Sequence, residues 1–343
     1  MRLLQKTLYV TTEDAYLTLD GENAVLRQRD VEMARFPLHL LESIISFSYA
    51  GASPALMGAC AERGINMAFC TPRGRFLARS SGEANGNVLL RRTQYRVADD
   101  LQQSCGIARH MIYGKLSNAR WSLDRTLRDH ALRVDAVRLE AVVERLRADM
   151  KRVLAVESID SLRGIEGEAA AAYFAVFDDM ILHAKGDFYF HERSRRPPLD
   201  YVNAMLSFAY ALLSNHCASA LEAAGLDSYV GFLHRDRPGR SSLALDLMEE
   251  LRPCFADRFV LTLINTGAIS AKDFEQRESG AVILTDNGRK RFLTAWQERR
   301  QDAITHPFTK EKMPWGFVPH IQALLLARFL RGDIDGYPPF LWK

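Results

Sequence analysis

Three short segments in the second half of the chain carry side chains that could bind a metal ion. Glu166 lies in RGIEGEAAAAYF, His234 ends GFLH, and Asp246 and Glu249 lie in LALDLMEELRP. Oxygen donors with a single imidazole suit a hard or borderline ion such as Mg²⁺ or Mn²⁺, whereas zinc fits less well because no thiolate joins them. The pattern therefore favours a metal-activated site for phosphodiester or other hydrolytic chemistry.

Helical spacing would position the first of these residues. On a helix over 159–183, steps of three, four and seven residues place Glu166 on one face with Ala169, Ala170 and Tyr173. The small alanines would let another backbone or a bulky ligand come close to that face.

The other candidates follow an apolar run or lie on a second helix. His234 lies where an apolar run meets a basic loop, which is a plausible position for a ligand. The pattern SLALDLMEELRP predicts a helix that ends at Pro253, with Asp246 and Glu249 three residues apart on neighbouring faces. Spacing alone leaves open which of these two carboxylates would bind the ion.

Other interpretations of the same residues are available. A single acid on an amphipathic helix usually faces water, and a histidine after an apolar run is more often a hydrogen-bonded core residue than a ligand. The whole protein could be a non-catalytic DNA-binding scaffold whose acids form structural ion pairs with Arg235, Arg237 or Arg252. A metal-dependent hydrolase of a small substrate is a third hypothesis, which the scattered basic loops disfavour.

Four segments carry a resemblance to a known family. RGIEGEAAAAYF, DYVNAMLSFAYALL from Asp200, GFLH and the acidic helix ending in ELRP occur in that order. They resemble the CRISPR-associated spacer integrase, the metal-dependent endonuclease-like subunit of the spacer-acquisition machinery, and the resemblance spans roughly the whole chain.

The resemblance implies the ligand set. In that family a Glu, a His and a later acidic residue bind the divalent ion, and matching segments imply Glu166, His234 and Glu249 here. The last position is often Asp in relatives, so Glu249 is a departure that still supplies a carboxylate. We prefer Glu249, the more C-terminal acid of its pair, as the ligand, with Asp246 supporting the site without touching the ion.

The resemblance also implies the reaction and the partners. The family's 3′-hydroxyl attack on a target phosphodiester joins a DNA strand to its target, whereas attack by water would make the same site a nuclease. The expected substrate is DNA that is double-stranded, branched or has 3′ ends. The expected assembly is a homodimer working with a small CRISPR-associated partner protein of ferredoxin-like fold.

Charge indicates where DNA could bind. The net charge of +3 and the pI near 8.6 are only weakly basic, so overall charge does not itself argue for nucleic acid. The loop with Arg235, Arg237 and Arg240 adjoins His234, where a phosphate would need cationic neighbours. We predict that these three arginines, together with Arg252, contact DNA.

Composition places the chain among intracellular globular proteins. Its 343 residues have room for two domains, and 48% hydrophobic residues suffice for ordinary cores. Early acidic residues argue against a secretory signal, and no apolar run approaches the ~20 residues that span a bilayer. Five cysteines without CxxC spacing indicate buried thiols, not a disulfide framework or zinc site. We expect a cytoplasmic protein without a membrane partner.

A change of period along the chain predicts an α+β protein. Residues 1–80 alternate apolar and polar residues in short runs typical of strands, with turns at Asp20-Gly21 and Pro72-Arg73-Gly74 and a short helix in ASPALMGACAERG. We predict that this small β-rich domain serves dimerisation, because a domain of ~80 residues rich in edge strands often needs a partner to cover it.

A larger all-α catalytic domain is expected to follow. The polar stretch 81–87 is the predicted linker, and residues 88–343 form the α-helical metal-dependent domain. The expected helices cover 88–104, 106–130, 135–150, 159–183, 200–224, 242–256, 289–299 and 317–331.

Overall fold

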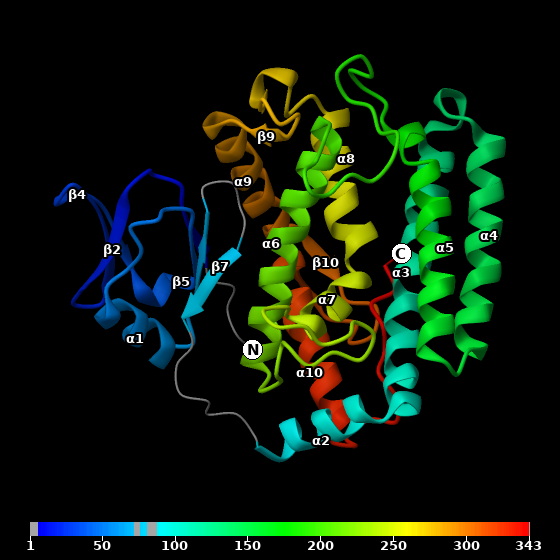
Figure 1. Ribbon diagram of the computed structural model, residues 1–343, viewed down its shortest axis with the longest axis horizontal. Helices are drawn as coiled ribbons and strands as arrows, with labels where there is room; N and C mark the ends of the chain where they lie inside the picture. The colour runs from blue at the N-terminus through cyan, green and yellow to red at the C-terminus, as the bar shows by residue number, and fades with distance from the viewer. Residues whose placement is uncertain (1–5, 72–75, 81–87, 343) are drawn as a thin grey trace. The chain divides into compact units, whose positions relative to one another are not determined.

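The computed structural model describes residues 6–71, 76–80 and 88–342 (Figure 1). The chain divides into two compact units. The N-terminal unit contains seven strands, a short helix and one helix that is remote in sequence, while the helical unit contains the remaining helices. The predicted linker at 81–87 and the predicted turn at Pro72-Arg73-Gly74 lie outside the described residues.

Two sheets build the N-terminal unit. One is four-stranded with the order β1-β5-β6-β7, in which β7 alone runs antiparallel to its neighbour, and the other is an antiparallel sheet with the order β2-β3-β4. The strands are β1 (Lys6–Val10), β2 (Ala15–Asp20), β3 (Asn23–Gln28), β4 (Val31–Pro37), β5 (Leu41–Ser46), β6 (Asn66–Cys70) and β7 (Phe76–Ser80). The helices of this unit are α1 (Pro54–Glu62) and α9 (Asp286–Gln301).

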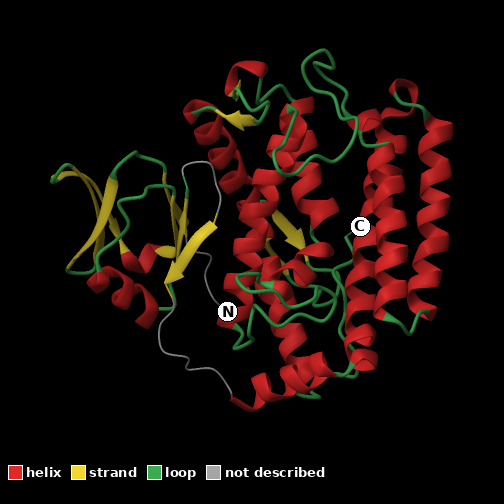
Figure 2. Ribbon diagram, in the orientation of Figure 1, coloured by secondary structure: helices red, strands yellow, loops and turns green. Residues whose placement is uncertain are grey.

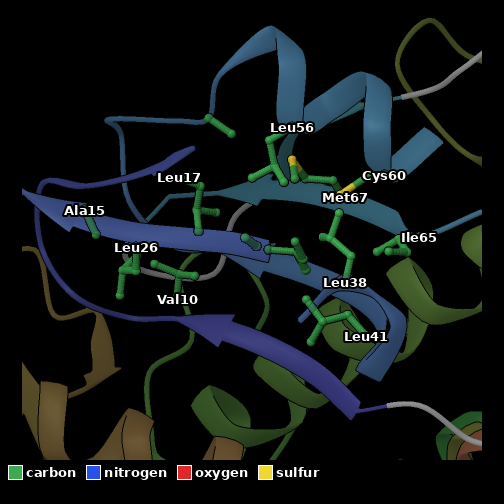
Figure 3. Packing of buried hydrophobic residues seen from close by; sticks show 13 residues of the cluster. Val10, Ala15, Leu17, Leu26, Leu38, Leu41, Leu56, Cys60, Ile65 and Met67 are labelled. Atoms are coloured by element: carbon green, nitrogen blue, oxygen red, sulfur yellow. The ribbon is translucent and has the colours of Figure 1, made fainter. Parts of the chain in front are cut away.

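Buried apolar side chains from both sheets and α1 form the core of this unit. Leu17 on β2, Leu26 on β3, Met67 on β6 and Leu56 on α1 belong to one cluster (Figure 3). The predicted Asp20-Gly21 turn is confirmed, because Asp20 pairs with the first residue of β3 and the intervening glycine has a φ of +54°. The alternation of apolar residues thus identified this β-rich region correctly.

Helices dominate the rest of the chain (Figure 2). They are α2 (Val88–Asp99), α3 (Leu101–His130), α4 (Ala136–Ala155), α5 (Ile159–Ala175), α6 (Tyr201–Ala223), α7 (Ser242–Glu249), α8 (Arg258–Asn265) and α10 (Val318–Leu330). The short pairs β8 (Phe274–Gln276) with β9 (Val282–Leu284) and β10 (Ala303–Thr305) with β11 (Lys312–Pro314) add four small strands. The prediction of a β-rich region followed by a helical one is confirmed.

Short 3₁₀ turns connect several of these elements. They are η1 (Leu38–Leu40), η2 (Ala131–Arg133), η3 (Asp178–Met180), η5 (Ala271–Asp273) and η6 (Trp315–Phe317).

Capping residues set where the long helices begin. Asp100 accepts hydrogen bonds from the backbone N–H groups of Gln102 and Gln103, so α3 begins at Leu101 and not at the predicted 106. Asp200 caps α6 as predicted, accepting from the N–H of Asn203 at 2.7 Å. From its capped start α3 runs for 30 residues and packs against α4 and α5, which lie beside it in Figure 1.

The helix expected to end at Pro253 has a different shape. Regular α-helix ends at Glu249, and a π-helical segment, η4 (Arg252–Asp257), carries the chain past Pro253 into α8. Proline lacks an N–H group and disrupts the i→i−4 ladder, so a wider turn accommodates it. The α8 helix was not predicted.

The cysteines and the apolar character of the helices bear on two expectations from composition. All five cysteines are buried free thiols, as predicted. Among the described residues, none of the helices combines the length and the apolar character needed to cross a bilayer.

Candidate metal centre

Glu166 and Glu249 come together in space although they belong to different helices. Glu166 lies in the middle of α5, where its side chain is 26% exposed, and Glu249 is the last residue of α7, where its side chain is only 4% exposed. The predicted face of α5 is confirmed, since Ala169 and Tyr173 are buried on the same side. The packing of α5 and α7 around α3 therefore brings two carboxylates to one place.

A lysine lies between the two carboxylates. The ammonium group of Lys115 on α3 contacts Oε1 of Glu166 and lies 2.7 Å from Oε2 of Glu249. Arg252 adds a second cation, with its Nη1 atom 3.1 Å from Oε1 of Glu249. Two buried or half-buried carboxylates are thus balanced by two cations, as burial of charge requires.

Opposing influences set the pKa values in this cluster. Burial alone would raise the pKa of Glu249, but Arg252, Lys115 and His234 outweigh it and lower the pKa to about 2. Burial would lower the pKa of Lys115, but the carboxylates of Glu249 and Glu166 outweigh it and raise the pKa. Both groups are therefore charged at neutral pH.

His234 is fixed by Asp246. The imidazole Nδ1 atom lies 2.6 Å from Oδ1 of Asp246, and the backbone N–H of His234 donates to the same oxygen at 3.0 Å. The other oxygen, Oδ2, accepts from the N–H groups of Phe232 at 2.6 Å and Leu233 at 2.9 Å. The Asp246 carboxylate already accepts three backbone N–H groups, so it also acts as the acceptor for Nδ1–H of His234. The Nε2 atom of His234 therefore carries the lone pair that remains free.

Close packing explains the glycine that begins GFLH. A Cβ atom at Gly231 would lie 2.8 Å from Oδ2 of Asp246 and 2.9 Å from the carbonyl carbon of Ser242. Such distances are shorter than van der Waals contact, so only glycine lets the loop lie against the start of α7. Arg163 on α5 holds the other side of the loop by donating from Nε to the carbonyl oxygen of Leu233 at 3.0 Å.

The donor set fits a divalent cation chemically, although it is not assembled as a finished site. Within the described part of the chain, no three His, Cys, Asp or Glu side chains lie close enough together to hold a metal ion. Two carboxylates nevertheless converge on one cation, the ammonium group of Lys115. Oε2 of Glu249 lies 2.7 Å from the Lys115 ammonium, so a metal ion could bind this oxygen only in place of that ammonium.

A cleft of about 630 Å³ adjoins His234. Its lining includes Phe232, His234, Arg163 and Arg235, together with carboxylates such as Asp160. His234 therefore lines a space that is large enough for part of a substrate.

The four arginines predicted to contact DNA have different surroundings. The side chain of Arg235 is 71% exposed and pairs with Asp160 at 3.1 Å, and Arg237 is exposed. Arg240 is half-buried, and burial together with the nearby Arg237 lowers its pKa. Arg252 is only 19% exposed, and its guanidinium lies 4.9 Å from the centre of the Tyr210 ring as well as beside Glu249.

Lys115 is the residue of this site that we did not predict from the sequence. A helical signal for it exists, because Met111, Lys115, Asn118 and Ser122 follow one another at steps of four, three and four residues and all are buried. A lysine within such a buried stripe needs a counter-charge, and that requirement could have pointed to the site.

Comparisons with known proteins agree on one family. The sequence profile of the family described as CRISPR associated protein Cas1 matches residues 8–298. The CRISPR-associated endonuclease Cas1 1 of Chlorobaculum tepidum is 50% identical over 337 residues, which cover 98% of this chain and 98% of that protein.

Solved structures share the fold. A casposase bound to an integration product superposes with a TM-score of 0.84 at 22% identity, covering 99% of this chain and 95% of the other. A Cas6-RT-Cas1–Cas2 complex gives a TM-score of 0.80 at 24% identity, covering 99% of this chain and 36% of that chain.

Proposed function

Since the chain belongs to the CRISPR-associated protein Cas1 family, we propose that it joins DNA ends to a target by strand transfer, with Glu166, His234 and Glu249 as ligands of a divalent ion. The enzyme class predicted from the sequence, an endonuclease and integrase of this family, is confirmed by this membership. The observation that carries the assignment of residues is the convergence of Glu166 and Glu249 on one cation.

Two of the three proposed ligands, His234 and Glu249, are held in place by other side chains. Asp246 holds the backbone and Nδ1 of His234, so Nε2 is left to bind the ion, and Asp246 has no oxygen to spare. This use of both oxygens favours Glu249 over Asp246 as the third ligand. Arg252 pairs with Oε1 of Glu249, and Oε2 is the oxygen that the Lys115 ammonium contacts.

We propose Mg²⁺ or Mn²⁺ as the ion, because two carboxylates and one imidazole are hard or borderline donors. When bound, such an ion would polarise the target phosphodiester and stabilise charge that develops on phosphorus. In the reaction the 3′-hydroxyl oxygen of the incoming strand bonds to phosphorus, the bond from phosphorus to the 3′ oxygen of the target strand breaks, and that strand is released with a 3′-hydroxyl. The attacking hydroxyl gives its proton to solvent in the cleft, and the departing 3′ oxygen takes up a proton from solvent.

The exposed arginines beside the cleft would hold the DNA backbone. Arg235, Arg237 and the half-buried Arg240 follow His234 directly, so they can bring guanidinium groups to phosphates next to the site. Arg252 has a different role in this proposal, since its burial against Glu249 and Tyr210 suits an internal counter-ion. The ion pairs that a non-catalytic scaffold would show do occur, but family membership favours the enzyme.

The assembly follows from the family as a further proposal. The Cas6-RT-Cas1–Cas2 complex is a solved neighbour of this fold, and we propose that this chain likewise works with a small ferredoxin-like partner of the Cas2 kind. The N-terminal unit would hold two copies together as a homodimer acting on duplex or branched DNA with 3′ ends. We propose that the protein acts in the cytoplasm, where such DNA would be found.

Isosteric substitutions test the ligand set. Glu166→Gln, His234→Ala and Glu249→Gln should each abolish joining of a 3′-ended DNA to a target duplex in Mg²⁺ or Mn²⁺, while DNA binding persists. Glu168→Gln is the matched control, because Glu168 lies two residues away on the exposed side of α5 and should keep full activity. The Glu249 variant should also unfold more easily, because Lys115 and Arg252 lose a buried partner.

Two outcomes would contradict the assignment. Full activity of Glu249→Gln together with an inactive Asp246→Asn would make Asp246 the third ligand. Activity in both variants would remove α7 from the site.

A further inference from the structure

Lys115 occupies the place where the two proposed carboxylate ligands meet. Its ammonium group contacts Glu166, lies 2.7 Å from Glu249, and is carried by a side chain that is only 11% exposed. We propose that Lys115 is a displaceable internal counter-ion, which keeps the two carboxylates together before the divalent ion binds and opposes its binding. This inference rests on the proposed function, because it takes Glu166 and Glu249 as ligands.

The balance of charge supports this role. Without a bound ion, Lys115 and Arg252 neutralise Glu166 and Glu249, so the cluster carries no net charge. A divalent ion between the carboxylates would lie within a few ångströms of the ammonium group, where repulsion between like charges is strong because little water screens it. Lys115 must therefore move before the ion binds fully, and its charge weakens the affinity.

The structure provides room for that movement. A small cavity of about 30 Å³ lies against Lys115, and its lining includes Tyr210 and Asp257 together with Arg193, Arg195 and Arg252. This volume exceeds the ~10–15 Å³ that one water-sized group needs, and the four-carbon stem of lysine is flexible. Asp257 already accepts a hydrogen bond from the Tyr210 hydroxyl at 2.5 Å, so the cavity gives the lysine stem room to move without holding the ammonium there.

The counter-ion role of Lys115 also explains why a third ligand is not gathered with Glu166 and Glu249. Glu166 and Glu249 are held by Lys115, and among the described residues no three candidate ligands are gathered closely enough for a metal ion. In this conformation the lysine takes the bridging position that the ion would take. Departure of Lys115 would leave both carboxylates free to turn toward His234.

Removal of the charge should have opposite effects on the ion-free and ion-bound protein. Without Lys115, Glu166 and Glu249 repel each other, so the ion-free protein should unfold at a lower temperature. The same change removes a competitor of the ion, so affinity for Mn²⁺ should rise. A residue that merely packs in the core would lower stability without tightening metal binding.

The test compares full-length wild type with Lys115→Met, Lys115→Gln and Lys115→Arg. Mn²⁺ titrations followed by electron paramagnetic resonance give the dissociation constant, and thermal unfolding with and without Mn²⁺ gives the stabilisation by the ion. Lys151→Met is the matched control, because Lys151 is an exposed lysine of the neighbouring helix α4.

We expect both neutral variants to bind Mn²⁺ about tenfold more tightly than wild type, with a larger rise in unfolding temperature on adding Mn²⁺. Lys115→Arg keeps the charge and should stay within about threefold of wild type. Equal or weaker Mn²⁺ binding by the neutral variants would overturn the inference, as would equal tightening in the arginine variant.

A neutral Lys115 variant that fails to fold without Mn²⁺ also tests the counter-ion role. If the neutral variants fold only when Mn²⁺ is present, the counter-ion role is supported, whereas failure to fold even with Mn²⁺ overturns it. A different result would contradict the proposed function itself. In that case wild type would bind no Mn²⁺, or Glu166→Gln would bind Mn²⁺ as tightly as wild type, irrespective of the behaviour of the Lys115 variants.

Discussion

Replacement of Asp246 by asparagine should loosen the loop that carries His234. Asp246 is fully buried and accepts four hydrogen bonds, two on each oxygen, from the N–H groups of residues 232–234 and from the His234 ring. Asparagine keeps one oxygen and replaces the other by an NH₂ group that cannot accept. Two of the four donors therefore lose their acceptor and face another donor.

The magnitude follows from the number of bonds lost. Hydrogen bonds to charged groups contribute about 1.5–3 kcal/mol each, so the loss of two should lower the free energy of unfolding by about 3–6 kcal/mol. Urea unfolding of the full-length protein, followed by circular dichroism, measures this change. Removal of a partner behind a ligating histidine should also weaken Mn²⁺ binding about 10- to 100-fold.

A neighbouring acid provides the control. Asp236 is an exposed residue on the same loop, and Asp236→Asn should change the free energy of unfolding by less than about 0.5 kcal/mol. A loss below about 1 kcal/mol in Asp246→Asn would refute the reasoning, because four bonds to a buried carboxylate would then contribute far less than their geometry implies.

Two further predictions concern DNA binding and pH. Replacement of Arg237 and Arg240 by alanine should weaken DNA binding similarly for unrelated sequences and reduce the salt slope by about 1–2, because each phosphate contact releases counterions; an unchanged slope would place the phosphate path elsewhere. Burial raises the pKa of Glu250 from its ordinary 4.5 to about 7, although Tyr337, Gln322 and the Phe340 N–H donate to it. The folded protein therefore takes up this proton first, so stability should rise as pH falls from about 7 to about 4.5. This rise should become smaller in Glu250→Gln, with the remainder coming from Asp257, whose pKa burial raises from 3.8 to about 6. An unchanged rise in that variant would show that Glu250 does not contribute.

Local patterns in the sequence predicted the elements and many of the site residues. The face of α5 that carries Glu166, the start of α6 at Asp200 and the hairpin at Asp20-Gly21 all follow from periodicity, capping and turn chemistry, which act over a few residues. The four arginines and the acidic pair on α7 were likewise named from the sequence. The different roles of these residues were not predicted from the sequence, because the exposure of each side chain depends on what packs against it.

Helix boundaries show the limit of such patterns. The end of α7 at Glu249 and the π-helical segment through Pro253 depend on how that segment packs, while the sequence indicated only that proline disturbs the helix. Helix α9 belongs to the N-terminal unit although it lies far along the chain from the strands. No local signal states which distant surface an amphipathic helix will cover.

Spacing and periodicity along the chain were enough to place an acid, an imidazole and a second acidic pair on or beside helices of a largely helical region. The packing of the helices, in contrast, establishes that Asp246 holds His234, that Arg252 turns inward to Glu249, and that Lys115 joins carboxylates 51 and 134 positions away along the chain. The physical reason is that helix faces follow from spacing over a few residues, whereas ion pairs between helices form only where packing excludes water and brings opposite charges together.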